Sequence, residues 1–359
     1  MASDVSPVDW RRAEQIATRI SGRHGDGKPD GNAAGSAFAS LELSPLIPRL
    51  EDQIESATGL RSLSGPAVVQ VIDRPDWIRA NISSFQHLLE PAFEQWSAKL
   101  PKKGIPATIS SQLVGAELGA LLGWMSTRVL GQYDLLVGRD DSDDAVYMVG
   151  PNLAAIEKRF GFDPEEFRTW VLLHELTHRA QFTGVPWMKA HFTGLVDTSV
   201  RLANPDPRRI ADAIRDAFSD RDRARQRVRD SGIMGLIASP EQREVIQQIA
   251  GLMSLLEGHG DVTMSRAAGE LVPSAGRFAA VLQARRRRSN PLSRLMLRLT
   301  GIEGKLNQYA AGERFIAAIE LEGGPRAVDV CWQAPVNLPS MEEIRDPQLW
   351  LDRVGALVA

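Results

Sequence analysis

The segment DPEEFRTWVLLHELTHRAQFTG, residues 163–184, carries the clearest helix signals in this chain of 359 residues. Asp163 can cap a helix, proline is tolerated at the first helical position, and Glu166 completes a capping box. Gly184 supplies a stop signal. Apolar residues between these ends fall around most of the helix surface, which predicts a buried helix over residues 164–183.

An HExxH pattern lies in the middle of this predicted helix, formed by His174, Glu175 and His178. Residues four apart share one helix face, so the two histidines can present ring nitrogens to one metal ion. Zinc held by two histidines and a third protein ligand lowers the pKa of its water to about 7. Glu175 lies about 100° around the helix, where it can act as general base. The alternative, two core histidines beside a buried glutamate, would cost on the order of several kcal/mol.

A third ligand has to come from elsewhere, and a predicted apolar helix over residues 246–268 offers two candidates. Glu257 shares a face with Asp261, which can hydrogen-bond the second nitrogen of a ligand histidine. His259 lies about 200° from Glu257 on a regular helix, so one excludes the other. We favour Glu257 because it brings this partner with it. His259 then becomes a candidate for stabilising an oxyanion.

The remaining patterns predict a mainly helical α+β chain with a small sheet. Short apolar runs predict strands at Val68–Ile72, Ala145–Val149 and Val328–Gln333. A loop rich in glycine and polar residues is predicted over residues 24–36. Helical spacing predicts further helices at 8–20, 41–58, 75–100 with a break near Pro91, 112–136, 187–202, 208–218, 305–321 and 341–354.

The most apolar of these segments, residues 112–136, contains three charged residues and therefore lacks an uninterrupted membrane-spanning run of about 20 apolar residues. Gly115, Gly119 and Gly123 fall one turn apart on one face. Each glycine inside a helix lowers its stability by about 1 kcal/mol relative to alanine. Three glycines on one face therefore predict close packing against another backbone. We expect that backbone to be the HExxH helix.

Composition narrows the possible functions. The formal net charge is −3, so no global field favours nucleic acid or an anionic membrane. The arginines at 285–288 have no interleaved aromatic residues, which favours a solvated turn over a nucleic-acid site. Cys331 is the only cysteine, so an internal disulfide is excluded. The first ten residues show no signal-peptide pattern, and we expect a cytoplasmic protein. The sequence gives no oligomeric state.

These motifs together resemble a known group of enzymes. The HExxH helix followed downstream by Glu-x-x-x-Asp is similar to the gluzincin branch of the zincin metallopeptidases. The resemblance implies His174, His178 and Glu257 as ligands of one zinc ion, Glu175 as general base and Asp261 as partner of a ligand histidine. Further stretches look like a largely actinobacterial family of zincin-like proteins. These stretches are residues 119–134, 170–181, 257–259 and 305–315. Some members of that family are labelled as associated with deazaflavin coenzyme biosynthesis.

The resemblance covers most of the chain from about residue 68 onward. It implies a zincin-like catalytic domain over residues 67–359, after a helical or flexible segment over residues 1–66, and hydrolysis of a peptide or protein substrate. Tyr309 joins His259 as an oxyanion candidate. The alternative is a metal-binding scaffold or regulatory protein of the same fold. We identify no deazaflavin-binding site. Arg179 departs from the general zincin signature, which has an uncharged residue there.

Peptidases of this type commonly hold the substrate against an edge strand above the metal-site helix. An extended peptide adds to such an edge by main-chain hydrogen bonds. Ala145–Val149 is our candidate for this strand, which makes Tyr147 and Val149 the expected substrate contacts. A core strand without substrate contact is the alternative.

Overall fold

The computed structural model describes residues 6–23, 45–99, 107–135, 144–203, 238–287 and 302–358. For residues 90–99, 107–110, 270, 285–287, 302–310 and 355–358 only the backbone is described. The chain forms two compact units: the first contains Met1–Asp52 and Leu63–Arg179, and the second contains Gln53–Ser62 and Ala180–Ala359. The loop predicted at 24–36 and the helix predicted at 208–218 lie outside the described residues.

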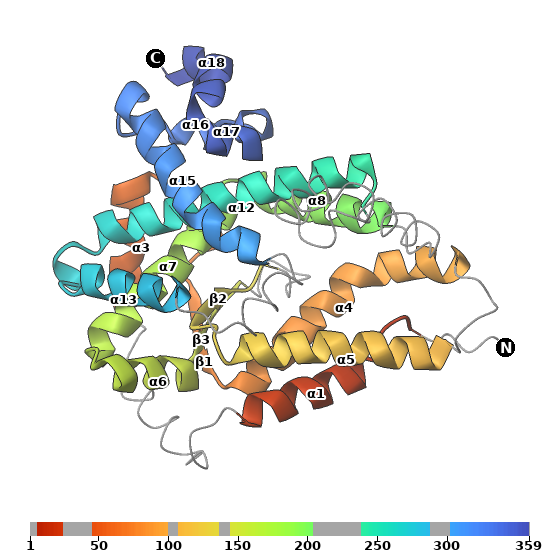
Figure 1. Ribbon diagram of the computed structural model, residues 1–359. Helices are drawn as coiled ribbons and strands as arrows, with labels where there is room; N and C mark the ends of the chain where they lie inside the picture. The colour runs from red at the N-terminus through yellow and green to blue at the C-terminus, as the bar shows by residue number, and fades with distance from the viewer. Residues whose placement is uncertain are drawn as a thin grey trace. The chain divides into compact units, whose positions relative to one another are not determined.

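The first unit contains the sheet (Figure 1). Helices precede the first strand, separate it from the second and follow the third. Its elements in chain order are α1 (Trp10–Arg23), the first half of α3 (Leu46–Thr58), β1 (Val68–Ile72), α4 (Arg74–Lys99), α5 (Ala107–Ser126), β2 (Gly131–Tyr133), β3 (Ala145–Val149), α6 (Gly150–Phe160) and most of α7 (Pro164–Gly184).

The second unit is helical in its described residues. After the ends of α3 and α7, its elements are α8 (Met188–Leu202), α12 (Pro240–Ala267), the 3-10 turn η1 (Gly269–Leu271), α13 (Ala275–Arg287), α15 (Ile302–Gly323), α16 (Asp329–Gln333), the 3-10 turn η2 (Pro335–Asn337), α17 (Met341–Arg345) and α18 (Pro347–Val358). Among the described helices, none combines the length and apolar character needed to cross a bilayer.

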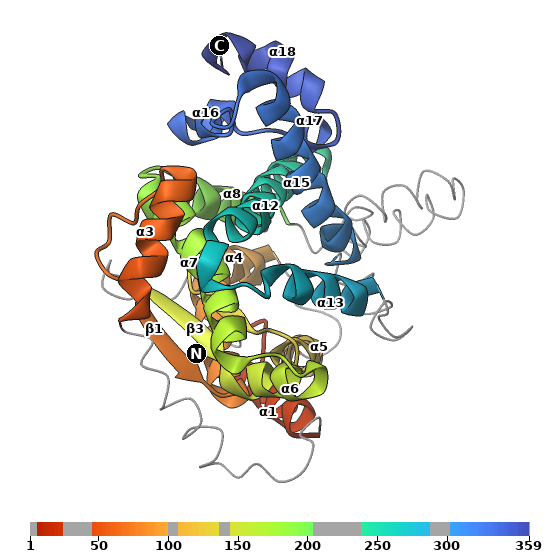
Figure 2. The ribbon, with the colours of Figure 1, turned by 90° about the vertical axis from the view of Figure 1, so that its left-hand side faces the viewer.

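The sheet has three strands in the order β1-β3-β2. β3 pairs with β1 in parallel, as the two neighbouring arrows in Figure 2 show, and with β2 in antiparallel. The prediction that Ala145–Val149 forms an edge strand is therefore wrong, because both of its sides are paired. Four of its five residues are buried, and a near-continuous apolar run is what a strand covered on both faces requires.

The core of the first unit lies where α1, α4 and α5 pack together and meet β3. Its buried members are apolar side chains that the sequence distributes at helical spacing. They are Ala13, Ala17, Trp77, Ile78, Ile82, Leu122 and Val149. The helix α1 thus packs within the same unit as the sheet.

The glycine face of α5 packs against α1. A methyl group added at Gly119 would lie 2.4 Å from the carbonyl oxygen of Ala13. One added at Gly123 would lie 2.6 Å from that of Ala17, and one added at Gly115 would lie 2.3 Å from that of Asp9, the residue just before α1. The predicted close backbone contact is thus confirmed, but the expected partner, the HExxH helix, is wrong. The helix also ends at Ser126, and the residues that follow turn back to form β2.

Gly119→Ala is expected to lower the free energy of unfolding. Alanine would gain about 1 kcal/mol of helix propensity, but its methyl group would force the backbones apart, and overpacking of this kind costs about 1–3 kcal/mol. Urea unfolding measures the difference. Gly194→Ala is the matched control, since Gly194 lies inside α8 with no atom within 4 Å of its added methyl group. Equal gains in stability at both positions would contradict the packing argument.

Two further predictions differ from the structure. Val328–Gln333 was expected as a strand, but the structure forms helix α16 there, because a short apolar run fits a buried helix as well as a strand. The predicted break near Pro91 is absent, and α4 continues through it. Proline removes one hydrogen bond of the helix, which a helix of 26 residues accommodates here.

The HExxH helix is confirmed as α7, with both predicted ends in place. Asp163 caps it, since its Oδ1 accepts a hydrogen bond of 2.9 Å from the backbone N–H of Glu166. Its apolar side chains are buried, and those of Phe167, Leu172 and Leu173 have no exposed surface. α7 is therefore a core helix, and polar groups in its middle are held within protein.

The second unit is arranged around α12, which contacts α8, α15 and α17. The crossing with α15 is very close, because a methyl group added at Gly312 would lie 2.0 Å from the carbonyl oxygen of Ser254. Gly258 on α12 meets Gly312 in the same contact. α12 is thus held against α15 with backbone touching backbone.

Candidate metal centre

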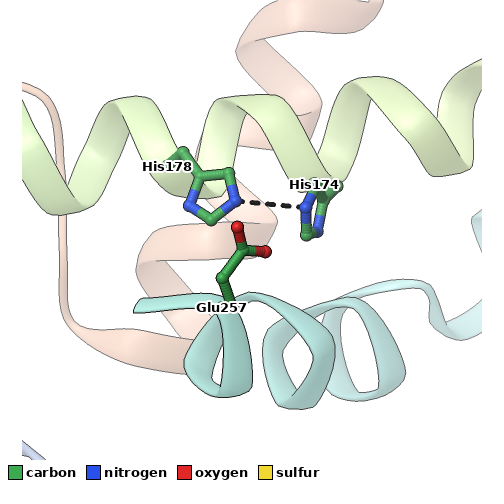
Figure 3. A group of neighbouring side chains, drawn as sticks. All are labelled: His174, His178 and Glu257. Atoms are coloured by element: carbon green, nitrogen blue, oxygen red, sulfur yellow. Dashed lines mark hydrogen bonds between the residues drawn. The ribbon is translucent and has the colours of Figure 1, made fainter. Parts of the chain in front are cut away.

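Helix α7 brings its two histidines together as the four-residue spacing predicts. The Nε2 atoms of His174 and His178 lie 3.1 Å apart, and the rings meet edge to face with centroids separated by 4.5 Å. Both side chains are half-buried. Figure 3 shows the two rings side by side on one face of the helix.

Glu257 on α12 completes the group. One atom from each of His174, His178 and Glu257 can be chosen so that all lie within 4.8 Å of one another. The Glu257 carboxylate points toward the two rings in Figure 3. Within the part of the chain that the structure describes, this is the one group of three potential metal ligands found by this criterion.

This donor set fits zinc. Two nitrogens bound tetrahedrally at about 2.0–2.1 Å from zinc would be separated by roughly 3.3 Å, close to the observed 3.1 Å between the Nε2 atoms. Two imidazoles and one carboxylate, with a fourth position open, is also the ligand set of known catalytic zinc sites. His174, His178 and Glu257 would hold the ion.

His259 has a different place from Glu257. It is buried, with its Nδ1 2.9 Å from Nε2 of Gln181 and its ring packed edge to face against Trp332. The structure brings Glu257, and not His259, to the two histidines. A regular helix produces this separation, because residues two apart point to nearly opposite sides.

The other predicted site residues are spread more widely. Asp261 lies half-buried on α12, one turn beyond Glu257, and its role beside a ligand histidine stays a prediction. Tyr309 belongs to α15, but its side chain lies outside the described atoms. Tyr147 is half-buried on the central strand β3, whereas Val149 is fully buried in the core, which does not favour contact with a substrate.

Glu175 is buried directly beneath the strand β2. Its Oε2 accepts a hydrogen bond of 3.0 Å from the backbone N–H of Tyr133. A methyl group added at Gly131 would lie 2.6 Å from Cγ of Glu175, so only glycine permits this approach. Sequence reasoning missed this contact, although a glycine in a short strand is itself a signal of close approach.

Arg179, the charged residue that departs from the zincin signature, is buried with a full set of partners. Its Nε donates to Asp144 at 2.6 Å, and its two terminal nitrogens donate to Glu51 at 2.8 Å and to the carbonyl oxygen of Gly65 at 2.7 Å. Burial and the neighbouring Asp144 raise the pKa of Tyr133 well above its usual value, so its hydroxyl stays protonated. This cluster ties α7 to the residues that flank the sheet.

The fold and the site define a class of protein. In this class, an HExxH helix and a glutamate from a separate helix together form a group that can bind a metal ion. The sequence profile of the zincin-like metallopeptidase family matches residues 8–351, and the chain belongs to that family. A protein from Chloroflexus aurantiacus, whose crystal structure was described as that of a candidate hydrolase with a novel fold, is 31% identical. That match covers 97% of this chain and 99% of the other, with a TM-score of 0.71.

A comparison with curated proteins found no match. The family and the structural relative together support a function of the hydrolase or metallopeptidase type.

Proposed function

We propose that this chain is a zinc-dependent metallopeptidase that hydrolyses peptide bonds in a peptide or protein substrate. The observation that carries the proposal is the convergence of His174, His178 and Glu257, from two helices, within 4.8 Å. Glu175 follows His174 directly on α7, so the same helix supplies two ligands and a carboxylate suited to proton transfer. The family match supports the same activity.

In this proposal Glu175 moves the protons. Zinc held by the three ligands would polarise the scissile carbonyl and make water nucleophilic near neutral pH. Glu175 removes a proton from the attacking water as its oxygen bonds to the carbonyl carbon, and it returns a proton to the amine nitrogen as the C–N bond breaks. The hydrogen bond from Tyr133 N–H fixes one carboxylate oxygen, which orients the group throughout.

The strand β2 replaces β3 as the proposed binding edge for the substrate. β2 is an outer strand of the described sheet, and it passes over Glu175. An extended peptide can add to an outer strand by main-chain hydrogen bonds. Tyr309 remains our candidate for stabilising the oxyanion, and Asp261 our candidate for orienting a ligand histidine.

Zinc content and peptide cleavage test the proposal together. Protein purified without chelator is expected to contain about one zinc per chain, because three protein ligands with a fourth position open can hold one ion. Incubation with a mixed peptide library is expected to release new N-termini, detected by mass spectrometry. 1,10-Phenanthroline should stop the cleavage and added zinc should restore it.

Substitutions of the proposed ligands test whether His174, His178 and Glu257 bind the zinc ion. Glu257→Ala and His174→Ala are expected to lose zinc, because each leaves two protein ligands at most. His87→Ala is the control, since His87 is exposed on α4 and outside the group. Zinc binding without any cleavage would favour a metal-binding scaffold, and the absence of zinc from zinc-replete protein would overturn the proposal.

A further inference from the structure

Gln181 is a fully buried amide on α7, one turn beyond His178. Its Nε2 lies 2.9 Å from the carbonyl oxygen of Leu256 and 2.9 Å from Nδ1 of His259, both on α12. A side-chain amide nitrogen carries two hydrogens, so one atom of Gln181 can donate to both groups at once. This pair of bonds joins the end of α7 to α12.

The chemistry of the partners fixes the orientation of the amide. A backbone carbonyl only accepts, so the Gln181 atom facing Leu256 must be the nitrogen. Nδ1 of His259 must then accept as well, which places the proton of the neutral imidazole on Nε2. His259 is held further by its edge-to-face contact with Trp332, at 5.1 Å between ring centroids.

These two contacts straddle Glu257, which lies between Leu256 and His259 in the chain. Gly258 contacts Gly312 of α15. It lies about 200° around α12 from Leu256, so α15 holds this turn from a different side. The turn that carries Glu257 is thereby fixed both in rotation and along its axis. Gln181 and His178 lie on the same continuous helix, α7.

We infer that Gln181 and His259 are positioning residues, which set the place of Glu257 as the third zinc ligand by locking α12 to α7. The inference rests on the proposed function, and it assigns His259 a positioning role in place of ligation or oxyanion stabilisation. Outer residues that orient metal ligands typically contribute about 10–100-fold to metal affinity.

Zinc affinity of the full chain, measured by competition with a chromophoric chelator, tests this inference without any substrate. Gln181→Met keeps the length of the side chain but removes both donors, and we expect zinc affinity to fall about tenfold or more. Thr183→Val is the matched control, because Thr183 on the same helix donates instead to Ser62 Oγ at 2.8 Å. Its zinc affinity should equal that of the unaltered protein.

A double-mutant cycle separates positioning from a general loss of structure. If Gln181 acts through Glu257, Gln181→Met should weaken zinc binding in the unaltered protein but not in Glu257→Gln. His259 provides a second pair of variants if Gln181→Met does not fold. His259→Leu removes the acceptor and should weaken zinc binding, whereas His259→Asn keeps an acceptor near the position of Nδ1 and should retain it.

Unaltered zinc affinity in folded Gln181→Met, or an equal loss in the Glu257→Gln background, would overturn this inference alone. Equal zinc affinity in His259→Leu and His259→Asn would do the same. Failure of the unaltered protein to bind zinc would overturn the proposed function first, so the two failures are distinguishable.

Discussion

Glu175→Gln is expected to lower the rate of peptide hydrolysis by about 10²–10⁴-fold, the usual contribution of a general base. Glutamine has nearly the same shape but cannot take a proton from water. Its amide oxygen can still accept the hydrogen bond that Tyr133 N–H donates to Glu175, so the strand β2 should stay in place. The measurement is kcat on a peptide found by library cleavage, with zinc content and thermal unfolding recorded for the same sample.

The control for this variant is Glu165→Gln. Glu165 is exposed in the first turn of α7, so the substitution removes the same charge from the same helix away from the metal-binding group. Both variants should keep one zinc per chain, and only Glu175→Gln should be inactive. Substantial hydrolysis by zinc-loaded Glu175→Gln would show that another group takes the proton.

The parts of the site that depend on local spacing could be predicted from the sequence. His174 and His178 meet because residues four apart on any α-helix share a face, and the caps of α7 are read directly from Asp163 and Gly184. Glu257 could be placed on a helix by the same periodicity. Its separation from His259 also follows from helix geometry alone.

The parts that depend on contacts between distant segments could not be predicted. Strand order is a property of pairing between segments, and it placed Ala145–Val149 in the middle of the sheet rather than at its edge. The partner of Gly119 was likewise undetermined, because a glycine face requires a close neighbour without specifying which one. Gln181 gave no local signal, since its function depends on Leu256 and His259, more than seventy residues away.

Arg179 shows how such distant contacts explain a local departure from a motif. Its position directly after His178 is unfavourable for a charge by itself, because α7 is buried there. Three segments that are remote in the chain supply its acceptors: Glu51, Gly65 and Asp144. The charge is therefore compatible with the core only when the first unit is folded.

Arg179→Met is expected to lower the free energy of unfolding by about 3–5 kcal/mol, the usual cost of removing one member of a buried ionic group. Methionine fills part of the space but leaves the Asp144 and Glu51 carboxylates without the guanidinium that now binds both. Arg179→Lys should recover only part of this loss, because an ammonium lacks the planar set of donors that reaches three acceptors. Urea unfolding followed by tryptophan fluorescence measures both variants.

Arg201→Met provides the matched control, because Arg201 pairs with Asp197 at 2.8 Å but has a side chain that is 55% exposed, against 1% for Arg179. An exposed pair contributes about 0–1 kcal/mol, so this variant should be close to neutral. Combining Arg179→Met with Asp144→Asn and Glu51→Gln should restore part of the lost stability, because the two negative charges that the guanidinium balanced are then removed with it. If the triple variant is no more stable than Arg179→Met, the role of Arg179 lies in the packing and hydrogen bonding of its long side chain rather than in its charge.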